Sequence, residues 1–171
     1  MNILSNICRI TIILCIFCFA FAGIGYSQLD IRVSGRWRLT IDEDDMLGGA
    51  GSDLNSTYES NTDEVTLRIR NRNFKNWEYW AWHVDIHRVD GNWHSSFHLD
   101  IRRTGGGVGQ GSLSGLTAYE EIDDNAASPN PSFSGTYNYS SIPMQFRLRD
   151  VSLTIPPDDY DTTIVYTLVE D

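Results

Sequence analysis

The sequence predicts an all-β fold, an antiparallel immunoglobulin-like sandwich. Apolar and polar residues alternate in at least five segments, turn-forming residues separate these segments, and no segment has the period of an amphipathic helix. Greek-key and jelly-roll sandwiches share these patterns, so the order of the strands is left open.

The first predicted strand has the clearest alternation. From Leu29 to Ile41 the odd positions are mostly apolar and the even positions are mostly basic or polar. Because neighbouring side chains of a strand point to opposite faces, one face is expected to be buried and the other to be exposed and basic. A polar, glycine-containing stretch over residues 42–63 is typical of a surface loop, and the alternation resumes from Val65 to Ile69.

A β-hairpin is predicted from Trp80 to Ile101, with its turn at Asp90-Gly91. If these two residues are the centre of the turn, Trp82 lies opposite Leu99 and apolar side chains meet on one face. This register carries the predictions made below for the histidines.

Further strands are predicted from Leu113 to Ile122, where a short helical turn is the alternative, from Ile142 to Leu148 and from Tyr160 to Val169. Loops are predicted over residues 104–112 and 123–134. The alternation changes phase between Leu148 and Val151, which indicates a β-bulge or two short strands. The sequence contains no internal repeat and no sign of a second domain.

The N-terminus has the layout of a secretory signal peptide. The single basic residue Arg9 precedes a mostly apolar run from Ile10 to Phe19, and small residues follow. We expect cleavage after Ala22, or at a position up to residue 28, which leaves one β-sandwich domain over residues 29–171. The run is shorter than the roughly 20 apolar residues of a transmembrane anchor, so we expect none.

The three cysteines of the chain, Cys8, Cys15 and Cys18, all lie in the predicted signal peptide. Large residues precede Cys15 and Cys18, which disfavours lipid attachment. The processed chain is therefore expected to contain no disulfide, no catalytic thiolate and no cysteine-bound zinc.

The charge of the chain narrows the range of partners. It has 13 basic and 23 acidic side chains and a formal net charge of −10. Nucleic-acid binding depends on the neutralisation of phosphates by Lys and Arg, so we expect no nucleic-acid partner. The acidic run Asp42–Asp45 offers oxygen ligands for calcium but lacks the spacing of an EF-hand loop.

Two segments resemble secreted bacterial surface domains of the pilin and spore-coat type. In Leu153–Leu168, prolines and a turn lead into Tyr-x-Asp and an alternating last strand, and Leu29–Trp37 is similar to an N-terminal donor strand with a glycine among its inward positions. The resemblance implies an immunoglobulin-like sandwich with a role in assembly or adhesion outside the cell. The paired cysteines common in usher-pathway pilins are absent.

The hairpin register places the four histidines on the outward face, with His83 opposite His98 and His87 opposite His94. The β-carbons of directly opposed side chains lie about 5 Å apart, so two imidazoles can share a divalent metal. Each half-site needs a further ligand such as Asp85 or Asp100. We expect weak metal binding at most, and the sequence assigns no metal site.

No catalytic residue and no cofactor are predicted. Glu120 and Glu121 are adjacent on a strand and point to opposite faces, and no serine lies in a Gly-x-Ser-x-Gly motif. Ser96, His98 and Asp85 share the predicted outer face of the hairpin, but that face is flat and offers no pocket.

Aromatic residues are the remaining candidates for a ligand-binding site. Of the five tryptophans, three fall on predicted core faces, namely Trp37, Trp80 and Trp82. Aromatic side chains near strand ends can stack on sugar rings, and the candidates are Trp77, Tyr79 and Trp93.

We therefore expect a non-enzymatic module that is secreted, periplasmic or on the cell surface. Its expected role is structural or adhesive, through self-assembly at its N-terminal strand or through other extracellular subunits. The alternative is a lectin-like module that binds carbohydrate through surface aromatics.

Overall fold

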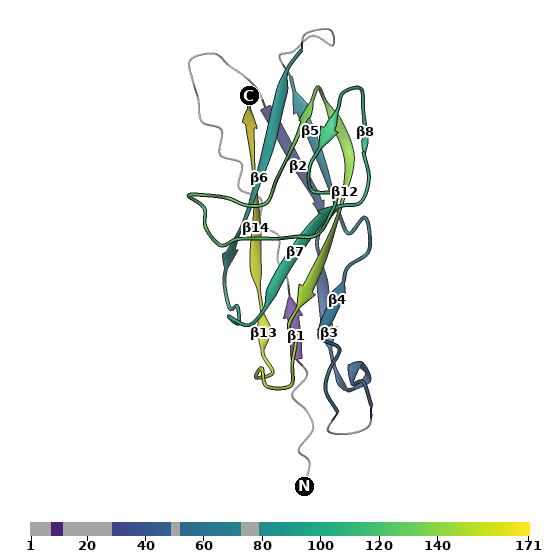
Figure 1. Cartoon of the computed structure of the whole chain (residues 1–171), viewed down its shortest axis with the longest axis vertical. Coiled ribbons are helices and arrows are strands. Elements are labelled where there is room, and N and C mark those ends of the chain that lie inside the picture. The colour runs from purple at the N-terminus through teal and green to yellow at the C-terminus, as the bar shows by residue number, and fades with distance from the viewer. Residues whose placement is uncertain (1–7, 12–28, 49–51, 73–78) are drawn as a thin grey trace.

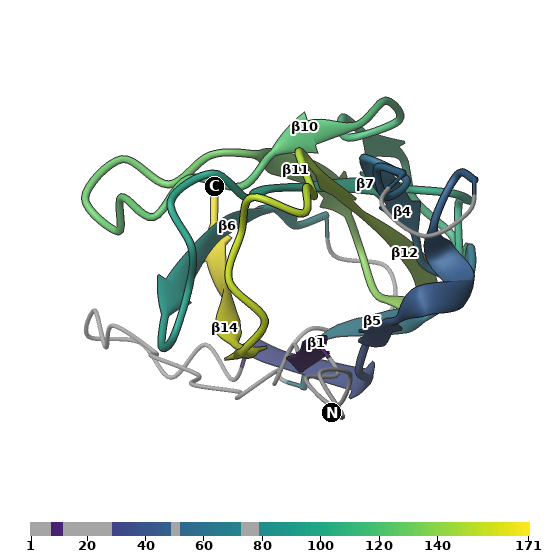
Figure 2. The ribbon, with the colours of Figure 1, turned by 90° about the horizontal axis from the view of Figure 1, so that it is seen from below.

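The computed structural model describes residues 29–48, 52–72 and 79–171, together with the backbone of residues 8–11. These residues form antiparallel β-sheets that pack as a sandwich, without an α-helix among them (Figures 1 and 2). The predicted all-β sandwich is thus confirmed. No helix within the described residues is long and apolar enough to span a membrane. Apart from residues 8–11, the predicted signal peptide lies outside this description.

The larger sheet has five strands in a continuous order. They are β10 (Glu120–Glu121), β7 (His98–Arg103), β12 (Tyr139–Arg149), β5 (Val65–Asn71) and β2 (Leu29–Gly35). Two short strands, β4 (Thr57–Glu59) and β8 (Val108–Gly109), also pair with β12.

The smaller sheet faces the larger one across the core. Its order is β14 (Thr162–Glu170), β6 (Ala81–Asp90), β11 (Ser132–Thr136) and β9 (Leu113–Ser114).

A third, three-stranded sheet lies at the lower end of the molecule in Figure 1. Its middle strand β1 (Cys8–Thr11) pairs antiparallel with β3 (Arg38–Ile41) and parallel with β13 (Asp159–Tyr160). A short 3₁₀ helix, η1 (Glu43–Asp45), follows β3.

The strand pairs are nested around the middle of the chain. β7 pairs with β10, β6 with β11 and β5 with β12, and the outermost strands β2 and β14 lie next to each other at one side of the sandwich. Among the described strands, β2 is hydrogen-bonded to β5 and not to β14. In an immunoglobulin sandwich the last strand pairs with the strand before it, whereas β14 pairs with β6.

The core lies between the two sheets and follows from the alternation of apolar residues. Every second side chain is buried along β5 and along the first part of β6, and the apolar residues at alternate positions from Ile142 to Leu148 of β12 are all buried. The largest fully buried side chains include Trp82, Phe146, Leu67, Ile86 and Ile101. Burial of apolar surface on this scale is the main stabilising term of such a fold.

The predicted hairpin from Trp80 to Ile101 is wrong. β6 pairs with β14 and β11, and β7 pairs with β12 and β10, so the two strands belong to different sheets. Trp82 and Leu99 are both buried, but they come from the two opposing sheets. The segment after Asp90 crosses from one sheet to the other.

Other predicted segments are partly different as well. Residues 113–122 form only the short strands β9 and β10, which lie in different sheets, and the loop predicted over residues 123–134 contains the start of β11. The change of phase before Val151 marks the end of β12 at Arg149, and the next residue, Asp150, has φ 63°. The irregular register of β12 lies instead between Tyr139 and Ile142.

The predicted strand Leu29–Ile41 is divided at Gly35. Gly35 has φ 105°, and a β-carbon there would lie 2.1 Å from the backbone oxygen of Glu64. Only glycine is compatible with both conditions. As a result, β2 stays on the larger sheet beside β5 and β3 leaves it.

We predict that Gly35→Ala destabilises the fold by about 3 kcal/mol, because the substitution combines an unfavourable backbone conformation with a steric clash. Urea unfolding followed by tryptophan fluorescence measures the change. Gly106→Ala is the matched control, since a β-carbon at Gly106 has no atom within 4 Å. Equal unfolding midpoints for the two variants would contradict the role assigned to Gly35.

Candidate functional site

The structure does not bring the histidines together in the predicted pairs. His83 and His87 are on the outward face of the smaller sheet, whereas His98 is on the outward face of the larger sheet. His94 lies in the crossing segment, where its ring contacts Phe97 and Tyr160. The pairs His83/His98 and His87/His94 therefore do not form, because the hairpin register on which they depended does not exist.

Two of the histidines, His83 and His98, have carboxylate partners. His83 Nδ1 lies 2.5 Å from Asp171 Oδ1 and its Nε2 lies 3.6 Å from Asp85 Oδ2. His98 Nδ1 lies 2.6 Å from Glu121 Oε1. Within the described residues, no group of three or more His, Cys, Asp or Glu side chains is placed to hold a metal ion.

His87 differs from these two histidines in its surroundings. Burial lowers its pKa, and the negative charge of Asp85 acts in the opposite direction without cancelling the effect. The imidazole of His87 is thus held towards its neutral form.

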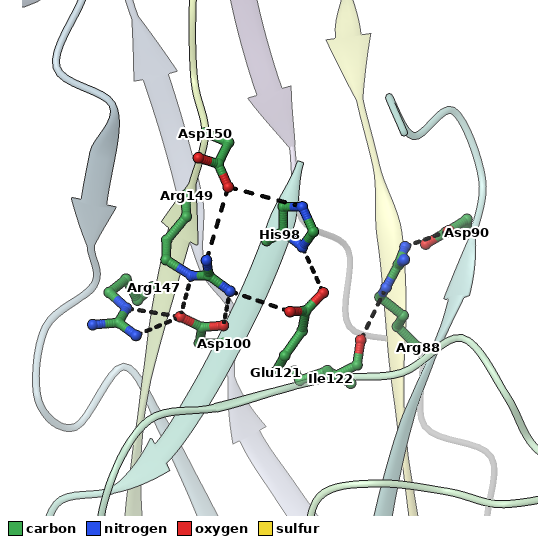
Figure 3. Close-up of polar contacts among 9 residues, drawn as sticks. All are labelled: Arg88, Asp90, His98, Asp100, Glu121, Ile122, Arg147, Arg149 and Asp150. Carbon is green, nitrogen blue, oxygen red and sulfur yellow. Dashed lines mark hydrogen bonds and ion pairs between the residues drawn. The ribbon is translucent and has the colours of Figure 1, made fainter. Parts of the chain in front are cut away.

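The main polar cluster is an ion network on the outward face of the larger sheet (Figure 3). At its centre is Asp100 on β7, a buried carboxylate that is only 1% exposed. It accepts hydrogen bonds from Arg147 Nε at 2.8 Å and from Arg149 Nε at 2.7 Å, and Arg149 Nη2 donates to its second oxygen at 3.0 Å. The register explains this geometry, because Arg147 lies directly opposite Asp100 and Arg149 lies opposite His98.

The network extends from Arg149 to the edge of the sheet. Arg149 Nη2 donates to Glu121 Oε2 at 3.2 Å, the other oxygen of Glu121 contacts His98, and His98 Nε2 is 3.8 Å from Asp150. Strand β10 carries Glu121 into this position by pairing with β7. The network therefore joins β7, β10 and β12.

The electrostatics of the network favour a structural role for Asp100. Burial raises its pKa, but the hydrogen bonds and charges of Arg149 and Arg147 outweigh burial and hold the pKa below its ordinary value. A carboxyl group that stays ionised and is bonded to two guanidinium groups cannot act as a general acid near neutral pH.

Tyr119 packs against arginines on the same outward face of the larger sheet. Its ring lies between the guanidinium groups of Arg102 and Arg147, at 4.3 Å and 4.0 Å from their central carbons. Burial raises the pKa of Tyr119, and the Glu59 carboxylate adds to the increase.

The hydrolytic combination considered from the sequence is not assembled. Asp85 belongs to β6 and His98 to β7, so they lie on different sheets. The backbone N–H of Ser96 donates to His94 Nδ1. The acidic run folds locally, because Asp42 caps η1 and its side chain accepts from the backbone of Asp44.

The aromatic residues divide between the core and the surface. Trp37, Trp80 and Trp82 are buried, as predicted. Trp93 is half-buried, with its ring against Phe97 and the guanidinium of Arg88 over it, and Arg88 Nε also donates to the Ile122 carbonyl oxygen (Figure 3). Tyr79 is 68% exposed and contacts Tyr137 edge-on, whereas Trp77 lies outside the described residues.

A second charged cluster was not identified from the sequence. It surrounds Asp30 on the outward face of β2 and β5 and contains Arg32, Arg68, Arg70 and Arg72. The basic face of β2 was visible as an alternation, but the arginines of β5 become its neighbours only through strand pairing. We refer to these four side chains as the arginine cluster.

Comparison with models of protein families, with curated proteins and with solved structures gives no significant match.

We predict that Asp100→Asn destabilises the protein by about 2–3 kcal/mol, because two partly buried guanidinium groups lose their anionic partner. Glu121→Gln is the control: its carboxylate bonds to the same Arg149 but is exposed, so the expected cost is below about 1 kcal/mol. Urea unfolding of both variants measures the difference, and equal losses would contradict the central role of Asp100.

Acid stability follows from the same carboxylate. Because the folded-state pKa of Asp100 is lowered, its contribution is present above the unfolded-state value of about 4 and is lost as pH falls through the folded-state pKa. We predict that the free energy of unfolding decreases below about pH 4 and that Asp100→Asn shows a shallower decrease. Identical slopes for both proteins between about pH 4 and pH 2 would contradict this assignment.

Proposed function

We propose that this chain is a non-enzymatic extracellular module that assembles with other subunits, or with copies of itself, by accepting a β-strand between β3 and β13. The observation that carries the proposal is the position of residues 8–11. Among the described strands, β1 is the sole partner of both β3 and β13, and it belongs to the segment that we expect to be removed on export (Figure 1).

Removal of that segment would leave two strand edges without a partner. Adjacent strands are about 4.8 Å apart, so β3 and β13, on either side of β1, are about 9.6 Å apart and leave room for one strand between them. The unpaired N–H and C=O groups of such edges favour the addition of a strand from another chain. With β1 in place, the side chains that border this position are buried, since Ile41 is 2% and Tyr160 is 4% exposed.

This proposal differs in one respect from the expected role of the N-terminal strand. β2 pairs along its whole length with β5 and contributes Ile31 to the core. Its residues are thus part of the fold, and the proposed assembly uses β3 as an acceptor edge. A variant that lacks Leu29–Val33 would lose a core strand. Loss of assembly in that variant would therefore not test whether the protein assembles or binds sugar.

A lectin-like role is the second candidate, and Tyr79 supports it. Its exposed ring, in edge-on contact with Tyr137, is the kind of surface on which a sugar can stack. Trp93 presents less free surface, because Arg88 covers its ring.

The test uses the chain that begins at Leu29 and a synthetic peptide of residues 6–13 with Cys8→Ser. We expect saturable binding of the peptide in calorimetry, because it restores the missing strand. We also expect oligomers of the shortened chain in light scattering, which the peptide dissociates. The matched control is the same peptide with Arg9→Pro and Ile10→Pro, since proline lacks the N–H that a strand needs.

Two results would contradict the proposal. One is equal binding of the two peptides, which would mean that strand pairing is not involved. The other is a shortened chain that stays monomeric and binds neither peptide.

A further inference from the structure

The arginine cluster is the least neutralised part of the larger sheet. Asp30 Oδ2 lies 3.1 Å from Arg72 Nη2, 3.3 Å from Arg32 Nε and 3.7 Å from Arg68 Nη2. Arg70 lies opposite Asp30 in the strand register, and it has no ion pair within the described residues. Three guanidinium groups thus contact one carboxylate, and a fourth arginine lies directly opposite on the neighbouring strand, in a chain whose net charge is −10.

This clustering of positive charges destabilises the folded chain when no ligand is bound. Arg32 and Arg68 lie directly opposite each other on adjacent strands, where like charges destabilise a sheet. Burial and the positive charges of Arg70 and Arg32 lower the pKa of Arg68. The buried Nε of Arg68 has no hydrogen-bond partner among the described residues.

The other half of the same sheet face has no such excess. There Arg147 and Arg149 share the buried Asp100, and Arg149 also contacts Glu121 and Asp150. Arg147 and Arg149 each have a carboxylate close by, and Arg102 bonds to Gln145 and stacks on Tyr119, whereas the guanidinium groups near Asp30 share a single carboxylate. The largest excess of positive charge on this face therefore lies on β2 and β5.

We propose that the arginine cluster binds the carboxylate or sulfate groups of an acidic polysaccharide. The position of Asp30 demonstrates that a carboxylate fits between these side chains, and the planar guanidinium fork matches such groups in a bidentate manner. The side chains of Arg32 and Arg72 are 57% and 55% exposed, so both are accessible to a ligand. Alternate residues along β5 are about 7 Å apart, which suits a polymer with repeated anionic groups.

The charge of the whole chain favours a polysaccharide over a nucleic acid. Duplex DNA carries one charge per about 1.7 Å of its axis, so a long stretch would meet the acidic remainder of the surface. An acidic polysaccharide carries its charges further apart and alternates them with neutral hydroxyl groups. This binding is independent of the strand addition proposed above, because it uses side chains of β2 and β5 and not the edge of β3.

The first experiment compares binding of polygalacturonate, dextran sulfate, neutral dextran and an oligonucleotide by biolayer interferometry at low salt. We expect binding of polygalacturonate or dextran sulfate, none of dextran, and weakening with added salt. The tighter of the two acidic ligands identifies the preferred anionic group. Equal binding of dextran, or tighter binding of the oligonucleotide, would overturn the proposal.

Paired variants locate the site. Arg70→Gln with Arg72→Gln should weaken binding of the acidic polymer by about tenfold or more, because two charge-assisted contacts are lost. Arg36→Gln with Arg38→Gln changes the net charge equally on exposed residues outside the cluster and should weaken binding less than about twofold. Equal losses in the two variants would mean that net charge alone is responsible and would overturn the site.

Asp30→Asn should strengthen binding of the acidic polymer, which is the opposite of the change expected for the arginine variants. Loss of the internal carboxylate removes a competitor for the guanidinium groups, so affinity for the acidic polymer should rise by about twofold to fivefold. Unchanged or weaker binding by a variant that retains the native circular dichroism spectrum would overturn the proposed role of Asp30 as an internal stand-in for the ligand.

Discussion

The register of β12 is the constraint on which most of the structure depends. This strand is the centre of the larger sheet and pairs with β5, β7, β4 and β8. Its inward side chains are almost completely buried, and its outward ones include Arg147 and Arg149, which hold Asp100. A slip of one residue would exchange the two faces and place arginines in the core. The apolar core and the ion network therefore specify the same register.

Strands could be predicted from the sequence more reliably than their partners. Period-two alternation identifies a strand with one buried face, and it predicted the strands now seen as β2, β5, β6, β7, β12 and β14. It cannot distinguish two strands that are neighbours in one sheet from two strands that face each other across a core. Trp82 and Leu99 satisfy both arrangements, which is why the hairpin and the histidine pairs were plausible from the sequence and absent from the fold.

The turn at Asp90-Gly91 has a different role from the one predicted. The hydroxyl of Thr162 donates to the Asp90 side chain at 2.8 Å, and the backbone N–H of Gly91 donates to the Asp161 carbonyl oxygen at 3.2 Å. These contacts join the end of β6 to the start of β14, and the chain then crosses to the other sheet. Strand β11 was missed for a related reason: its inward Gly135 leaves room for the ring of Trp82, so the strand has no run of apolar residues to detect.

The two charged sites could not be predicted from the sequence for the same reason, because strand partners were unknown. Both Asp100 with its arginines and Asp30 with the arginine cluster are built from strands that are distant in the sequence, so only strand pairing reveals them. The break at Gly35 then separates two properties of the N-terminal segment. Before the break, the outward side chains of β2 carry part of the arginine cluster, and after it, the backbone of β3 borders the position of β1. Side-chain charge and backbone edge are thus carried by different strands, so the two proposed interactions do not use the same groups.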